Sequence, residues 1–139
     1  MPRTTSLELR VRYAETDRMG VVYHSHYLIW CELGRTDHIR EGGMSYREME
    51  DAGIMLAVAE ANVRYRAPAR YDDLVRVETT LTDVSSRAVT FEYRILNAET
   101  GVLLATASTL LVALDSSHRV VKLPAEIRER LEASAGAAA

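Results

Sequence analysis

The chain has 139 residues, of which 47% are hydrophobic and 27% charged, and its formal net charge is −3. This length fits one domain with one hydrophobic core, and no segment approaches the roughly 18 consecutive apolar residues that a membrane helix needs. A slightly acidic chain also lacks the basic surface that general nucleic-acid binding requires. We therefore predict a single domain over residues 1–139, with neither membrane insertion nor nucleic-acid binding.

The N-terminus and the cysteine content indicate the compartment. The first ten residues, MPRTTSLELR, lack the apolar centre of a secretory signal. The single cysteine, Cys31, has no partner for an internal disulfide and lies on an apolar helical stripe, where a buried, inert thiol is expected. Both features predict a cytoplasmic protein.

The first half of the chain reads as one strand followed by two helices. Residues 7–13 alternate between apolar and charged side chains, which is typical of a half-buried strand. Residues 26–40 contain no proline and carry apolar side chains at helical spacing, which predicts one long helix. Gly42 and Gly43 suit its C-terminal end, and Ser45, three residues before a glutamate, predicts the N-cap of a short second helix.

The second half reads mainly as strands. Four further segments have a strand pattern: residues 57–67, 75–82, 89–95 and 102–114. The last of these is apolar on both faces, which favours a central or interface position. Short turn-like connections join the last three segments, so we predict an antiparallel meander.

The C-terminal segment begins with a proline. Pro124 is suited to the start of a helix, which we expect to end near Leu131. The alanine-rich residues 132–139 are expected to form a disordered tail.

About five long strands and one long helix predict an α+β fold. One helix, about 10 Å wide, covers strands spaced about 4.8 Å apart only if the sheet curls around it. A curved antiparallel sheet wrapped around one long central helix is the hotdog fold. Its exposed edge strand and two-sided apolar strand predict a homodimer or homotetramer.

The junction between the first strand and the long helix carries most of the ionisable groups that suggest chemistry. The segment YAETDRMGVVYHSHY, residues 13–27, places Asp17 in a loop ahead of a helix that begins near Ser25, a candidate N-cap. The first N–H groups of a helix lack intrahelical partners, and the helix dipole adds positive charge there. A carboxylate near such donors can attack a carbonyl group or activate water, while the donors stabilise the oxyanion.

These residues favour thioesters as substrates, because a thiolate leaves more readily without a general acid than an amine does. On the residues alone, Asp17 as a plain cap or turn residue remains the alternative.

The run RYAETDRMGVVYHSHY resembles the signature of the 4-hydroxybenzoyl-CoA thioesterase family, in the Y-x-x-T-D-x-x-G-V-V-Y-H-x-x-Y form of the bacterial acyl-CoA thioesterases of the YbgC type. The segment VRYRAPARYDD, residues 63–73, is similar to the strand and turn that follow in that family. The resemblance implies a hotdog fold and hydrolysis of acyl-CoA to a free acid and coenzyme A.

The resemblance also implies roles for particular residues. Asp17 corresponds to the catalytic carboxylate, acting either as the nucleophile or as a general base, and the two roles stay open. The backbone N–H of His24 is expected to polarise the thioester carbonyl. The His24 side chain, Tyr13 and Tyr23 are candidate substrate contacts.

Three arginines are candidates for contacts with the phosphates of coenzyme A. Arg64 and Arg66 alternate with apolar residues on one strand, so a solvated outer face is the alternative. Arg87 lies in the turn SSRAV, where members of the family contact the nucleotide end of coenzyme A.

Other chemistries fit the sequence less well. His24 and His26 diverge on a helix, and no cysteine or carboxylate completes a metal shell with them, so no metal and no cofactor are predicted. A rival of another class is a non-catalytic acyl-thioester-binding or cell-envelope-associated scaffold protein. A hotdog dehydratase is disfavoured because its His/Asp pair is not found.

Overall fold

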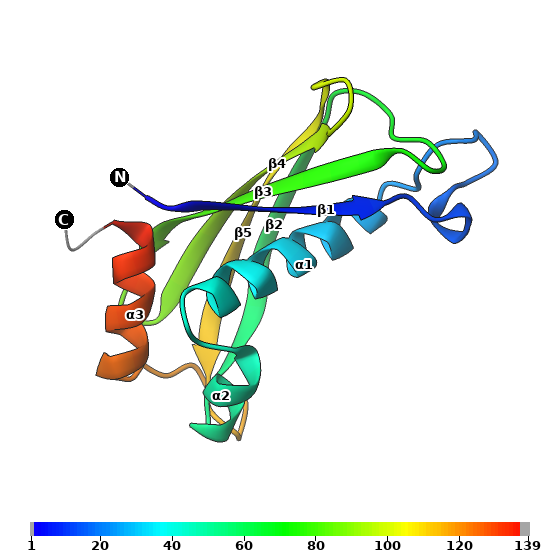
Figure 1. Ribbon diagram of the computed structural model, residues 1–139. Coiled ribbons are helices and arrows are strands. Elements are labelled where there is room, and N and C mark those ends of the chain that lie inside the picture. Colours follow the sequence, from blue (N-terminus) through cyan, green and yellow to red (C-terminus); the bar gives the residue numbers. More distant parts are fainter. Residues whose placement is uncertain (1, 137–139) are drawn as a thin grey trace.

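The structure is a computed structural model that describes residues 2–136. Its elements, in chain order, are β1 (Thr4–Arg10), α1 (His26–Glu41), α2 (Tyr46–Asp51), β2 (Met55–Tyr65), β3 (Leu74–Val84), β4 (Ala88–Asn97), β5 (Leu103–Leu114) and α3 (Ala125–Ala135). The strands form one antiparallel sheet in the order β1-β3-β4-β5-β2 (Figure 1). The predicted meander of the last three strands is therefore confirmed.

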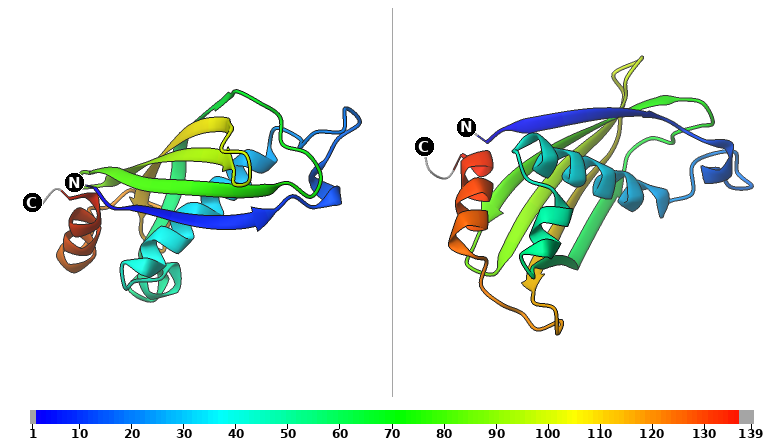
Figure 2. Two further views of the ribbon diagram at one scale, coloured as in Figure 1. Left: turned by 45° about the horizontal axis from the view of Figure 1, so that its top comes forward. Right: turned by 60° about the horizontal axis from the view of Figure 1, so that its bottom comes forward.

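The sheet curves around α1, which lies along its inner face (Figure 2). The helix buries Tyr27, Trp30 and Cys31 against that face, where β3, β4 and β5 contribute alternate valine, leucine and aromatic side chains. The α+β hotdog fold predicted from the sequence is confirmed.

Gly34 allows α1 to approach β3 closely. A Cβ atom at this position would lie 2.9 Å from Cγ1 of Val77, and closer still to Oγ1 of Thr79. Only a residue without a side chain fits at this distance, so Gly34 sets the depth at which the helix lies in the sheet.

The edge strand β2 departs from the predicted alternation. A bulge at Ala59 shifts the register with β5 between Val58 and Glu60. At the bulge two residues of β2 oppose one residue of β5. The alternation between the two faces of the sheet is therefore shifted by one residue from one side of the bulge to the other. The regular strand pattern read over residues 57–67 is therefore interrupted at Ala59.

The C-terminal helix corrects a second prediction. Helix α3 continues to Ala135, so residues 132–135 are helical rather than part of a disordered tail. Ser134 is buried, and its hydroxyl bonds to Nε2 of His38 and accepts a hydrogen bond from Arg3, which ties this last turn to α1 and to the segment before β1. Residues 137–139 of the predicted tail lie outside the described residues.

The two ends of α1 have different surroundings. Its C-terminal end lies near α3 and the β3–β4 hairpin, whereas its N-terminal end lies near the loops that follow β1 and β2 (Figures 1 and 2). No helix in residues 2–136 combines the length and the apolar character needed to cross a membrane.

Candidate active site

The loop between β1 and α1 folds back on itself. A single turn of 3-10 helix covers Tyr13–Glu15, and Thr16 forms an isolated bridge with Val22. The N–H of Asp17 donates to the carbonyl oxygen of Val21, with 2.9 Å between the two atoms. The N–H of Tyr23 donates to the carbonyl oxygen of Glu15, also at 2.9 Å. The loop is thereby held as a short closed hairpin in front of the helix.

Asp17 lies at the turn of this hairpin. Its backbone oxygen accepts a hydrogen bond from Gly20, whose φ of +77° is the left-handed conformation that glycine adopts without strain. Its Oδ1 accepts from the N–H of Met19 at 2.8 Å. Oδ2 makes no hydrogen bond within the described residues. The half-buried carboxylate is therefore oriented by one oxygen and keeps the other free.

A free backbone donor lies just before the start of α1. Ser25 is the N-cap residue, but its hydroxyl makes no capping bond, so the predicted side-chain cap is wrong. The N–H groups of His26, Tyr27 and Leu28 donate to carbonyl oxygens three residues earlier. Within residues 2–136 the N–H of His24 has no hydrogen-bond acceptor, which leaves it available to an oxyanion.

A cavity of about 280 Å³ opens beside this helix end. It is lined by the loop, α1 and the segment at the end of β2, including Val21, His24, Tyr27, Tyr65 and Arg66. Asp17 is not among the lining residues. The cavity brings together the His24 and Arg66 side chains that the sequence suggested.

Aromatic contacts fix the walls of the cavity. The Tyr65 phenol donates to the carbonyl oxygen of His24 at 2.9 Å, and its ring meets the buried Tyr27 ring edge-on at 5.1 Å. Tyr27 in turn accepts a hydrogen bond from the N–H of Ala69 at 3.3 Å. The exposed Tyr23 ring lies 4.3 Å from the imidazole of His24. Tyr65 was not among the predicted site residues, because in sequence it reads only as one more strand position.

Two predicted residues, Tyr13 and Arg87, do not line this cavity. Tyr13 was expected on the buried face of the first strand, but it follows the strand and is 77% exposed, with its ring edge-on to Tyr71. Arg87 lies in the β3–β4 hairpin, at the opposite end of the sheet from the start of α1 (Figure 1).

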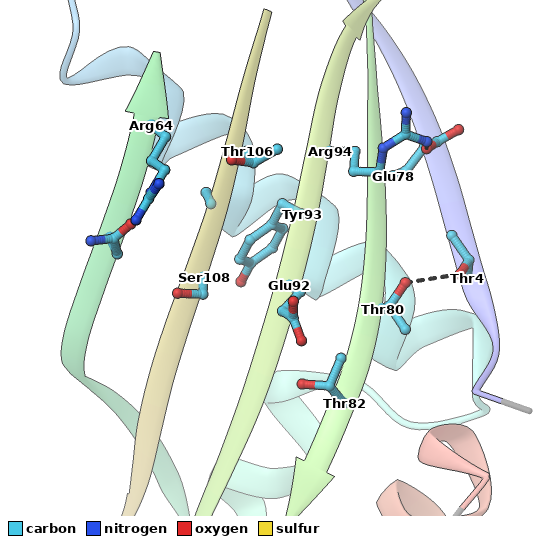
Figure 3. A pocket seen from close by; sticks show the side chains of 12 residues that line it. Thr4, Arg64, Glu78, Thr80, Thr82, Glu92, Tyr93, Arg94, Thr106 and Ser108 are labelled. Atoms are coloured by element: carbon cyan, nitrogen blue, oxygen red, sulfur yellow. Dashed lines mark hydrogen bonds and ion pairs between the residues drawn. The ribbon is translucent and has the colours of Figure 1, made fainter. Parts of the chain in front are cut away.

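Arg64 lies on the outer face of the sheet, away from α1. It borders a shallow hollow of about 580 Å³, shown in Figure 3. The hollow is lined by hydroxyl and charged groups, some of which already pair with each other: Thr4 with Thr80 at 2.8 Å, and Arg94 with Glu78 at 3.0 Å. Such a surface is typical of the solvated face of an antiparallel sheet, and it contains no group poised for acyl chemistry.

Glu15 is a second functional candidate that the sequence did not reveal. It is only 3% exposed. Its Oε1 accepts from the backbone N–H of Arg12 at 2.7 Å, and its Oε2 accepts from the indole N–H of Trp30 at 3.0 Å. Nδ1 of His26 is buried and unpaired, 4.0 Å from Oε2. Burial alone would raise the pKa of Glu15, but the hydrogen bonds from Arg12 and Trp30 and the Arg12 charge lower it below its ordinary value.

The chain is similar to a family model, to named proteins and to a solved structure that are all described as thioesterases or thioester hydrolases. The model of the thioesterase-like superfamily matches residues 11–131. YneP of Bacillus subtilis is 38% identical over 111 residues, which cover 80% of this chain and 75% of YneP. A protein of Escherichia coli O6:H1 named acyl-CoA thioester hydrolase YbgC is 36% identical over 77% of this chain and 79% of its own length. The crystal structure of a DHNA-CoA thioesterase from Staphylococcus aureus is 33% identical, covers 98% of this chain and 95% of its own, and superposes with a TM-score of 0.88.

Proposed function

Because this chain belongs to the thioesterase-like superfamily, we propose that it hydrolyses acyl-CoA thioesters to a free carboxylic acid and coenzyme A. The name of the relative from Escherichia coli, acyl-CoA thioester hydrolase, supports the choice of substrate. The structural observation that supports the proposal is that a carboxylate with one free oxygen and an N–H group without an acceptor occur in the same short segment. Asp17 and His24 supply them from a single closed loop in front of α1.

In the proposed reaction the thioester carbonyl oxygen accepts a hydrogen bond from the N–H of His24. The dipole of α1 adds to the stabilisation of the negative charge that develops on this oxygen. Removal of one oxyanion donor typically costs about 100- to 1000-fold in rate, so this contact is a large part of the expected catalysis.

Asp17 acts in one of two ways. As the nucleophile, its carboxylate attacks the carbonyl carbon, coenzyme A leaves as the thiolate, and water then hydrolyses the mixed anhydride. As the general base, it takes a proton from water, which attacks the same carbon, and the proton is available to the departing thiolate. A thiol with a pKa of about 8.5 leaves in either case without a strong acid.

The remaining candidates are assigned to substrate contacts. Arg66 and the His24 side chain are available at the cavity to the pantetheine and phosphates. Tyr23 does not line the cavity, but its ring lies against the imidazole of His24, and we assign it to the same substrate contact. Tyr13 is exposed beside the loop and is assigned to the rim of the site. Arg64 faces away from α1 on the outer side of the sheet, and Arg87 lies at the opposite end of the sheet, so their contacts with coenzyme A require the site of a partner protomer.

A homodimer would supply these arginines. Strand β2 pairs with β5 on one side and leaves its other side without a partner among the described residues. Exposed apolar side chains lie on this strand and on α1: Val58, Ile29 and Leu33. We assign this surface to contact with a second copy of the chain, in a dimer or a dimer of dimers.

We also assign the protein to the cytoplasm, where acyl-CoA is made and used.

The test measures free thiol released from a panel of acyl-CoAs with a thiol-reactive dye. We expect release by the parent protein and a rate at least about 100-fold lower for Asp17→Asn, since the amide neither attacks nor accepts the proton. Asp72→Asn is the matched control, because it removes a carboxylate from an exposed loop and asparagine tolerates its φ of +67°.

Each result has a definite meaning. Equal rates for the parent and Asp17→Asn would remove Asp17 from the mechanism. Binding of acyl-CoA without release of thiol would instead support a non-catalytic acyl-thioester-binding or scaffold protein. Mass spectrometry of acid-quenched enzyme distinguishes the two roles of Asp17, because only the nucleophile gains the mass of the acyl group.

A further inference from the structure

Glu15 occupies a central position in the junction, although it does not line the cavity. It is two residues from Asp17, and its carbonyl oxygen accepts the N–H of Tyr23, the residue before His24. Its side chain reaches across to Trp30 in α1. One residue therefore contacts the segment that follows β1, the base of the loop and the helix.

We propose that Glu15 is a positioning residue for thioester hydrolysis, which sets the placement of the Asp17 carboxylate relative to the N–H of His24. This inference rests on the proposed function. Glu15 acts through the loop rather than on the substrate, because its buried carboxylate faces Arg12 and Trp30.

The backbone of Glu15 closes the loop at its base. The bond from Tyr23 to Glu15, the bridge between Thr16 and Val22, and the bond from Asp17 to Val21 follow one another along the hairpin. A shift of Glu15 therefore moves the strand side of the hairpin, which carries Thr16 and Asp17, relative to the helix side, which leads to His24. Since reacting groups need to be placed to within a fraction of an ångström, such a shift lowers the rate even when the cavity is unchanged.

The side chain needs to be a carboxylate of this length. Two donors, the N–H of Arg12 and the indole N–H of Trp30, point at its two oxygens. A glutamine offers one oxygen and one NH₂ group, so one of the two buried donors would face another donor. An aspartate is one methylene shorter and keeps only one of the two bonds. An unsatisfied buried donor costs about 1–3 kcal/mol, which is sufficient to displace the loop.

The test compares Glu15→Gln with the parent protein in the thiol-release assay. We expect kcat to fall by about 10- to 100-fold with KM changed by less than about 3-fold, because substrate contacts are retained while the reacting groups are displaced. Glu15→Asp is expected to give an intermediate kcat. Ser134→Ala is the control for lost stability, since it breaks a buried hydrogen bond at the other end of α1 and is expected to leave kcat unchanged.

Trp30 gives a second measurement that does not depend on activity. It is the only tryptophan of the chain, so its fluorescence reports directly on the bond to Glu15. We expect Glu15→Gln to shift the emission while Ser134→Ala does not. In a Trp30→Phe background the loss of kcat caused by Glu15→Gln is expected to be smaller, because the glutamine NH₂ no longer faces an indole N–H.

The possible failures are distinguishable. A parent protein that releases no thiol from any acyl-CoA contradicts the proposed function itself. An active parent whose Glu15→Gln variant keeps the same kcat overturns only the role of Glu15. A fall in kcat that Ser134→Ala reproduces at equal loss of stability also overturns it, because the effect would then follow from stability alone.

Discussion

The phenol of Tyr65 donates a hydrogen bond to the carbonyl oxygen of His24, with 2.9 Å between the two oxygens. This bond joins the last residue of β2 to the residue two positions before α1. The N–H expected to bind the oxyanion belongs to that same residue, His24. The edge strand, which is also the expected dimer edge, therefore contributes directly to the geometry of the candidate site.

Tyr65→Phe removes this hydrogen bond and retains the aromatic ring. A single hydrogen bond contributes about 0.5–1.5 kcal/mol, so we expect kcat in the thiol-release assay to fall by about 2- to 10-fold. Tyr71→Phe is the control, because the Tyr71 phenol is exposed and makes no hydrogen bond within residues 2–136. An unchanged rate for Tyr65→Phe would show that His24 keeps its orientation without β2.

Cys31 is expected to be unreactive in the folded protein. Its side chain is fully buried, and burial raises the pKa of the thiol to about 12, so almost no thiolate is present at neutral pH. A thiol reagent should label the native protein very slowly and label one thiol per chain after unfolding in denaturant. Rapid labelling of the native protein would contradict this expectation. It would also mean that the dye of the thiol-release assay reacts with the enzyme itself and gives a background signal.

Gly34→Ala is expected to destabilise the fold. Overpacking costs about 1–3 kcal/mol, whereas replacing glycine by alanine within a helix gains about 1 kcal/mol, so a net loss is expected at the contact with β3. Urea unfolding measures the change. In a Thr79→Ala background the loss should be smaller, because the nearest atom, Oγ1, is gone. A stabilising effect of Gly34→Ala alone would show that α1 moves away from β3 at little cost.

His38 is expected to make stability depend on pH. Burial lowers its pKa to about 4 and the Arg3 cation lowers it further, whereas a hydrogen bond with the Thr79 backbone and the Asp37 charge oppose this shift. The unfolded chain therefore binds a proton at His38 more readily than the folded chain does. The contribution of this residue to folding stability is fully present above pH 6.5 and is lost as the pH falls from there to 4.

Between pH 7 and pH 5 we expect this residue to account for a loss of about 2 kcal/mol in the free energy of unfolding. The measurement is urea unfolding at both pH values for the parent and for His38→Gln, which cannot be protonated. The same pH dependence in both proteins would assign the effect to other groups.

The free edge of β2 gives a prediction about assembly. The exposed apolar side chains of α1 were assigned to the same interface, and Ile29→Glu combined with Leu33→Glu places two charges there. If this surface is the dimer interface, sedimentation should show a lower mass than that of the parent at the same concentration, because an unpaired charge is costly to bury. Arg47→Glu, a charge change on α2, is the control. If the parent protein sediments as a monomer, no partner protomer is present to contribute residues to the proposed site.

The elements were predictable because each depends on nearby residues. Period-two alternation identified the strands, and Gly42 marked the end of α1 as expected. Ser45 caps α2 by accepting the N–H of Glu48, also as expected. The bulge at Ala59 was not predictable, because alternation on either side of an alanine does not show the one-residue shift. The last turn of α3 was missed because its stability comes from contacts of Ser134 with His38 and Arg3, which are 96 and 131 residues earlier.

The sequence by itself determined the order of the elements, the hotdog arrangement and the segment that resembles the thioesterase signature. It singled out Asp17 through that resemblance but indicated no role for Glu15, two positions earlier. The tertiary structure buries Glu15 beneath Trp30 and leaves Asp17 at the turn with a free oxygen. The reason is physical: local patterns specify which side of an element is apolar, whereas the surroundings of a single carboxylate depend on what distant segments place against it.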